Sequence, residues 1–424
     1  MSIFKKSSVF ITALLLSTSS VFADGHKKTA SSDSIHALVD DGKFFGHIRY
    51  RYENVDEDGI AEEANANTVR INAGFETGNY LGLHALAELQ LVQQLGSEDF
   101  NSLANTPSGT FPTVADPDVQ QINRFWLGYN GIPDTNIKVG RQFINLDNQR
   151  FVGTVGWRQN DQTFDSATIT NNSIEGLTAQ YSFVNDVNRI FGDDAPPENL
   201  DSTVHLLNVS YDVADWLKLT GYGYWLDFDN AATLSSRTYG LRAKGKAPIG
   251  SGWNFIYEAE AATQEDHGNN TASYDEEYYH VSPGIKGHGF IFKLGYEVLG
   301  GDGTNSFQTP LATGHKFNGW ADKFLTTPAQ GLEDLYVLAG YKLNGTKTPF
   351  DGTTFKAIYH DFDGDSSGDF GSELDLSLGK SFKLPENGQP FDKVNVLFKY
   401  ADYNADDAPY TDTQKFWFQV SVNF

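Results

Sequence analysis

The sequence predicts an all-β protein: a transmembrane, antiparallel, up-and-down β-barrel of about 18 strands, with short periplasmic turns and long extracellular loops. Apolar residues recur at every second position in segments of about nine to eleven residues, the length of a tilted transmembrane strand. The connections between these segments alternate strictly between short and long. The chain is also rich in Phe (31), Tyr (20) and Gly (41), which favours strands and tight turns over helices.

The first 23 residues are typical of a secretory signal peptide. Lys5 and Lys6 form a basic head, residues 9–16 form an apolar stretch, and residues 21–23 form a small-x-small cleavage site. We therefore expect export through the Sec pathway to the outer membrane of a Gram-negative bacterium. Residues 24–42 are expected to form a polar periplasmic lead-in, and residues 43–424 to form the barrel.

The alternation begins in the first predicted strand. Phe44 and Ile48 share one face, whereas Arg49 and Arg51 share the other. A basic side chain facing lipid at mid-bilayer costs roughly 2 to 4 kcal/mol, so we expect the apolar face to contact lipid and the polar face to line a water-filled lumen. A soluble β-sandwich also alternates. Nothing in a sandwich requires short and long connections to alternate, however, so this pattern favours the barrel.

The overall composition excludes several classes of protein. The chain has no cysteine, which excludes disulfide scaffolds, thiolate metal sites and cysteine nucleophiles. Its formal charge of −24 argues against binding nucleic acid, whose phosphates must be neutralised by Lys and Arg. We find no hydrolase, metalloprotease, phosphate-loop or dinucleotide motif, and we expect no cofactor.

Most of the long connections are acidic, but two of them are neutral. These are residues 142–163 and 300–332. A loop that folds into the lumen must match the pore interior, so both are candidates for constricting the channel. We expect loop 142–163 to fold inward, and the sequence leaves open whether loop 300–332 plugs the lumen or only narrows it.

Charged residues with lumen-side parity predict a polar constriction. The predicted basic residues, on the early strands and the first neutral loop, are Arg49, Arg51, Arg70, Arg124, Arg141, Arg150 and Arg158. The predicted opposing acidic wall consists of Glu258, Glu260, Glu297, Glu373 and Asp375. Opposed basic and acidic arcs would create a transverse field that orients charged solutes. Alternatively, these charges pair with each other across the lumen.

The stretch from Val139 to Asp165, VGRQFINLDNQRFVGTVGWRQNDQTFD, resembles the alginate-export-type outer-membrane porins of Gram-negative bacteria. The resemblance implies a barrel of eighteen strands with a loop folded into an arginine-rich pore. It also implies that the terminal Phe424 resembles the C-terminal aromatic residue that the barrel-assembly machinery recognises. The residues that it implies at or near the constriction are Arg141, Asp147, Asn148, Gln149, Arg150, Trp157, Arg158 and Gln159.

One acidic stretch is a candidate calcium site on an extracellular loop. Asp361, Asp363, Asp365 and Asp369 alternate with other residues around glycines, as carboxylates do in loops that bind hard cations. The glycine is misplaced for an EF-hand, so an ordinary acidic loop is the alternative.

Together these patterns favour a passive outer-membrane channel. We expect it to pass small hydrophilic solutes, with anions such as uronates, oligosaccharides or other carboxylates as the favoured class. Outer-membrane lipids are the other expected partners. Two alternatives are a barrel enzyme of the lipase or protease kind and a plugged structural or adhesive surface barrel. The sequence does not predict the particular solute, the pore diameter, or whether the protein is a monomer or a trimer.

Overall fold

The computed structural model describes residues 32–104, 109–192, 199–384, 391 and 393–424. The predicted signal peptide and the first part of the lead-in lie outside the described residues. These described residues contain one short α-helix, α1 (Ala37–Asp40), and two 3-10 turns, η1 (Ala232–Leu234) and η2 (Gly314–Lys316). None of the helices in the described residues is long and apolar enough to cross a membrane.

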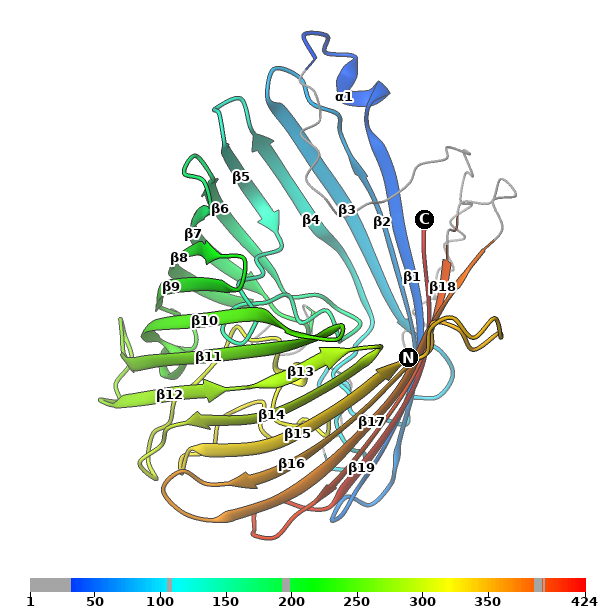
Figure 1. Cartoon of the computed structure of the whole chain (residues 1–424), viewed down its shortest axis with the longest axis vertical. Coiled ribbons are helices and arrows are strands. Elements are labelled where there is room, and N and C mark those ends of the chain that lie inside the picture. The colour runs from blue at the N-terminus through cyan, green and yellow to red at the C-terminus, as the bar shows by residue number, and fades with distance from the viewer. Residues whose placement is uncertain (1–31, 105–108, 193–198, 385–390, 392) are drawn as a thin grey trace, which may run out of the picture.

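All the other regular elements are strands of a single sheet, which Figure 1 shows curving around a central space. The strands are β1 (Lys43–Glu57), β2 (Ala64–Glu76), β3 (Leu83–Gln94), β4 (Val119–Tyr129), β5 (Thr135–Gln142), β6 (Thr163–Asn171), β7 (Leu177–Asn188), β8 (Asn199–Ala214), β9 (Leu217–Leu226), β10 (Ser236–Gly250), β11 (Trp253–Asp266), β12 (Asp275–Val281), β13 (Gly284–Gly287), β14 (Phe290–Leu299), β15 (Leu332–Lys342), β16 (Thr354–Asp363), β17 (Asp369–Lys383), β18 (Lys393–Asn404) and β19 (Thr413–Asn423).

The sheet closes into a barrel because its first and last strands pair. β1 is antiparallel to both β2 and β19. Aromatic side chains meet edge to face across the seam on the outer face, where the ring centroids of Tyr50 and Phe418 are 6.4 Å apart. Closure leaves no unpaired sheet edge, which is what allows strands to span a membrane.

The nineteen strand segments occupy eighteen strand positions around the barrel, which confirms the predicted fold class. β12 and β13 both pair with β11 and with β14, so they are two halves of one interrupted strand. The interruption falls at Ser282 and Pro283, and Pro283 has no N–H to give to a ladder. The short connections lie at one end of the barrel, called the short-turn end here, and the long connections lie at the other.

Side chains alternate between the two faces of the wall, as the sequence predicts. Leu241 is 71% exposed on the outer face, whereas the next residue, Arg242, is buried on the inner face. Phe125 and Trp126 repeat this contrast on β4. The outer face is therefore apolar, and the polar side chains of the strands point into the barrel.

Candidate functional site

Two long connections fill part of the lumen. We call residues 143–162 inner loop 1 and residues 300–331 inner loop 2. Their backbones bond to each other, because Gly153 N–H donates to the Leu311 carbonyl at 2.9 Å and Thr313 N–H donates to the Gln149 carbonyl at 3.1 Å. The Gln149 side chain also accepts a hydrogen bond from the Thr313 hydroxyl at 2.8 Å. The two inner loops are therefore one packed unit.

An aromatic cluster fixes this unit to the wall on the side of β9 and β12. The ring of Phe151 lies 5.4 Å from that of Tyr222, 5.2 Å from that of Tyr278 and 5.9 Å from that of Phe307. All four side chains are buried. Aromatic pairs at these separations add to the stability that burial alone provides, so inner loop 1 has its own hydrophobic anchor.

Three inward-facing arginines of β1 and β2 bind inner loop 1 on the side away from the aromatic cluster. Arg49 donates to the Gln159 side chain at 2.8 Å, and Arg51 donates to the Trp157 carbonyl at 2.5 Å. Arg70 forms an ion pair with Asp161 at 3.0 Å. The Arg51 guanidinium also lies 4.0 Å from the centre of the Trp157 ring. These buried arginines use their several N–H donors to hold the loop.

The two arginines of inner loop 1 pair with carboxylates. Arg158 lies 3.0 Å from Glu53 on β1 and 2.9 Å from Asp322 on inner loop 2. Arg150 lies 2.9 Å from Glu297 on β14. Burial alone would lower the pKa of Arg158, but the carboxylates around it outweigh burial and raise this pKa. The pKa of Arg150 is raised in the same way, chiefly by Glu297. Both guanidiniums therefore stay charged inside the lumen.

The structure does not bring Arg124 and Arg141 together with these five arginines. Arg124 pairs with Glu88 at 2.6 Å and covers the Phe143 ring. Arg141 forms a two-bonded pair with Asp165, at 2.8 and 2.9 Å. Asp165 lies between two buried, inward-facing residues of β6, so the pair is on the outer side of the wall.

The five residues of the predicted acidic wall all lie on the inner face. Glu258 and Glu260 flank Arg242, at 2.7 and 3.4 Å. Glu258 also accepts a hydrogen bond from Asn148 of inner loop 1 at 3.0 Å. Asp147, beside Asn148, lies 3.6 Å from Arg242. Charges of opposite sign are therefore paired between the wall and the loop.

Glu373 and Asp375 occupy the wall beneath inner loop 2. Glu373 accepts hydrogen bonds from the N–H groups of Trp320 and Ala321, the latter at 2.8 Å. Asp375 is fully buried and lies 3.8 Å from the His360 ring. Glu373 thus holds the backbone of inner loop 2 in place.

Arg242 was not among the predicted constriction residues, because the predicted arginines all lie between the first strand and the first neutral loop. Its partner Glu260 was predicted, and the two residues lie directly opposite each other on β10 and β11. Strand parity could therefore have found Arg242, because it shares the inward-facing parity of Lys244 and Lys246.

Lysines line the lumen between the inner loops and the short-turn end. The inward-facing lysines of β10, β13, β14 and β16 in this region are Lys244, Lys246, Lys286, Lys293 and Lys356. Lys293 is half-buried and the other four are exposed. Among the inward-facing residues of the short-turn halves of β10–β16, all of them described, Glu258 is the one carboxylate, and Arg242 neutralises it.

Lys316 of inner loop 2 adds a further positive charge to this basic region. Its ammonium group donates to the Asn148 carbonyl at 2.7 Å. Burial lowers the pKa of Lys316, and the positive charges of Arg242 and Lys244 lower it further, against the opposing effect of Glu258. The exposed positive charge of this region is therefore carried by lysines, and the predicted constriction included none of them.

The candidate calcium residues serve other contacts. Asp363 and Asp369 face each other where β16 and β17 meet, and Asp365 accepts a hydrogen bond from Gly301 N–H at 3.2 Å. Within the described residues, no group of three or more His, Asp or Glu side chains is arranged to hold a metal ion. Calcium binding stays a prediction.

Phe424 pairs through its backbone with Gly46 of β1, and its predicted role in assembly stays a prediction.

A closed barrel of eighteen strands with an apolar outer face and loops packed in its lumen is the fold of an outer-membrane porin. The family model described as alginate export matches residues 43–372, which is more than half of the chain. The protein belongs to this family, as the resemblance around residues 139–165 predicted.

Solved structures with the same fold include three proteins whose alignments cover nearly all of this chain. OpdK of Pseudomonas aeruginosa, solved with vanillate, has a TM-score of 0.72 and 15% identity, over 91% of this chain and 99% of its own. OccK3 (OpdO) of P. aeruginosa has a TM-score of 0.68 and 14% identity, over 92% and 97%. OccAB2 of Acinetobacter baumannii has a TM-score of 0.70 and 14% identity, over 92% and 99%. Comparison with curated proteins finds no match.

Proposed function

We propose that this porin-type channel passes small anionic solutes, such as uronates, their short oligomers or other carboxylates, down their gradients. The observation that carries the proposal is the set of inward-facing lysines, Lys244, Lys246, Lys286, Lys293 and Lys356, in a region whose one carboxylate is already paired. Exposed positive charge on a low-dielectric wall raises the local concentration of anions. OpdK was solved with vanillate, a small carboxylate, which supports the same solute class.

In this proposal the arginines and lysines have different roles. Arg49, Arg51, Arg70, Arg150 and Arg158 shape the constriction, because their side chains are buried and hold the inner loops. The exposed lysines meet the solute. Two loops packed in the lumen favour small solutes over a long polymer, so the proposal covers short oligomers of uronates rather than the whole polysaccharide named by the family.

Ion selectivity in planar bilayers tests the proposal. In a salt gradient, the wild-type channel should show a reversal potential of the sign that indicates anion preference. The double variant Lys244→Gln/Lys293→Gln should lose much of this preference. Lys380→Gln is the matched control, because Lys380 lies on the outer face of β17 and its removal changes total charge without changing the lumen. Equal selectivity in the double variant and the wild type would contradict the assigned role of the lysines.

Solute uptake separates the predicted solute class from other hydrophilic molecules. Liposomes that contain the channel should swell faster in glucuronate than in glucose, which has nearly the same size but no charge. Equal rates would show a general pore, and no swelling or conductance at all would favour the plugged structural barrel.

A further inference from the structure

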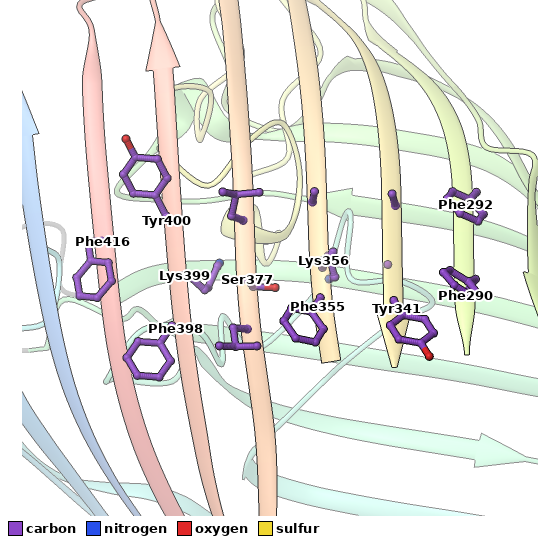
Figure 2. A pocket seen from close by; sticks show the side chains of 15 residues that line it. Phe290, Phe292, Tyr341, Phe355, Lys356, Ser377, Phe398, Lys399, Tyr400 and Phe416 are labelled. Carbon is purple, nitrogen blue, oxygen red and sulfur yellow. The ribbon is translucent and has the colours of Figure 1, made fainter. Parts of the chain in front are cut away.

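The lipid-facing surface of β14–β19 carries a hollow of about 520 Å³ near the short-turn end. Figure 2 shows Phe290, Phe292, Tyr341, Phe355 and Phe398 standing on the outer side of the strands around it. The hollow does not belong to the lumen site, because these side chains have outward parity. It is lined almost entirely by carbon.

The strand register explains why the surface is hollow here. Ala339 and Ala357 lie directly opposite each other on β15 and β16. Phe292 lies beside Ala339, and Leu376 lies beside Ala357. Two methyl groups therefore form the floor between larger side chains. The next row toward the short-turn end is large throughout, because Tyr341 lies opposite Phe355.

One cation lies on the same outer face, just beyond this row. Lys380 is two residues past Leu378 on β17, about 7 Å further toward the short-turn end. Its ammonium group donates to the carbonyls of Pro349 and Asp351, the latter at 2.9 Å, in the turn between β15 and β16. An ammonium has three N–H donors, so one is left for another acceptor. The turn thus fixes a positive charge at the edge of the apolar surface.

We propose that this hollow binds one phospholipid of the periplasmic leaflet. An acyl chain lies on the floor of Ala339 and Ala357, and the phosphate accepts a charge-assisted hydrogen bond from Lys380. The spacing suits this ligand, because a phospholipid carries its anionic group at the membrane edge directly above its chains.

Charge distinguishes a phospholipid from a second copy of this chain. In the short-turn halves of β14–β18, Lys380 is the one charged residue among the outward-facing residues that the structure describes. The strands of a second copy that docks with this same face would offer an apolar surface and a second Lys380, with no carboxylate among their described outward-facing residues to neutralise either cation. A phospholipid offers both a chain and an anion.

Native mass spectrometry of the detergent-solubilised protein, titrated with phosphatidylglycerol, tests the proposal. Ala339→Leu fills the floor and should weaken binding of the first lipid about tenfold, since the lipid loses contact with a few methylene-sized groups. Lys380→Gln should also weaken binding of phosphatidylglycerol. It should leave binding of a diacylglycerol with the same chains unchanged, because that lipid has no phosphate.

Two controls separate the site from general lipid adhesion. Ala167→Leu is an equivalent change on the exposed outer face of β6 and should not alter binding of the first lipid. Lys383→Gln removes a lysine of the same strand with the opposite parity and should also have no effect. Equal affinity in wild type, Ala339→Leu and Lys380→Gln would overturn the proposal. A lipid-free oligomer that Ala339→Leu dissociates would overturn it in favour of a second copy. These readouts are independent of conductance, so the channel proposal can fail without affecting this one.

Discussion

Arg158 of inner loop 1 and Asp322 of inner loop 2 form an ion pair of 2.9 Å inside the barrel, and both side chains are more than 90% buried. Arg158 also contacts Glu53 on the first strand, and Asp322 lies 3.7 Å from Lys415 on the last. Burial alone would raise the pKa of Asp322, but His315 and Lys415 outweigh burial and lower it. The pair therefore stays ionised and ties both inner loops to the barrel seam.

Replacing Arg158 should loosen the inner loops without unfolding the barrel. In Arg158→Met, Glu53 and Asp322 lose their common partner, and breaking a buried pair in this way costs about 3 to 5 kcal/mol. We expect larger and noisier single-channel currents, while the folded barrel still migrates as a heat-modifiable band on gels. Arg141→Met removes a partly exposed pair on the outer side and should change the current little, since such pairs contribute about 0 to 1 kcal/mol. Identical traces for Arg158→Met and wild type would refute the role of this pair.

Acidification should loosen the same region through His315. Its Nδ1 lies 2.7 Å from Asp322, and its Nε2 lies 2.6 Å from the Lys399 ammonium, which can only donate. Burial, together with the charges of Lys399 and Arg158, lowers the pKa of His315 well below its ordinary value, against the opposing effect of Asp322. His315 is therefore neutral and donates from Nδ1.

The sign of this effect follows from the lowered pKa. Below pH about 6.5 the released, solvated His315 binds a proton that the packed one does not, so the packed state loses stability as pH falls, by about 1.4 kcal/mol per pH unit. Channel noise in the wild type should therefore rise between pH 7.5 and 5. In His315→Gln this rise should be reduced, and an unchanged pH profile in this variant would contradict the assignment.

Replacing Gly319 with alanine should loosen inner loop 2, and the same replacement at Gly303 separates the effect of the clash from that of backbone strain. Gly319 has φ +82°, and a Cβ there would meet the carboxylate of Glu373. Gly319→Ala should strain the backbone by about 1 to 2 kcal/mol and also disturb the bonds from Trp320 and Ala321 to Glu373. Gly303 has φ +87° with nothing within 4 Å, so Gly303→Ala reports the backbone strain alone. Hydrogen exchange of inner loop 2 should be clearly faster in Gly319→Ala than in Gly303→Ala, and equal rates would contradict the predicted clash.

Removing the Phe151 ring should release inner loop 1. Phe151→Ala leaves a cavity among Tyr222, Tyr278 and Phe307, and such truncations cost about 3 to 5 kcal/mol. Limited proteolysis should then cut within inner loop 1. Phe255→Ala is the control, because Phe255 lies on the lipid-facing side of β11 and is 38% exposed. Equal resistance of both variants to protease would show that the aromatic cluster does not hold the loop.

The barrel could be predicted from the sequence because the alternation that produces it lies within each strand. A two-residue period is enough to place Arg49 and Arg51 on the inner face, and the resemblance around residues 139–165 identified the family. Parity within one strand also predicts the inward position of Glu258 and Glu297. None of these inferences requires knowledge of what lies across the lumen.

The partners of these charges could not be predicted, because they depend on how loops fold over long sequence distances. Arg49 binds Gln159, which is 110 residues away, and nothing in either segment specifies the other. A local irregularity in a strand also breaks the rule that alternate residues face opposite sides of the wall. A bulge beside Glu88 turns both Asn123 and Arg124 toward that carboxylate. The lysines follow the same two-residue period, although the basic residues of the predicted constriction were all arginines.

The contacts of Arg51 connect inner loop 1 to the strand that closes the barrel. Its guanidinium donates both to the Trp157 carbonyl of inner loop 1 and to Gln419 of β19, the last strand of the chain. Residues 51, 157 and 419 come from the start, the first half and the end of the sequence. The bond between Arg51 and Gln419 requires β19 to be paired with β1, so closing the wall adds one contact to the set that holds inner loop 1.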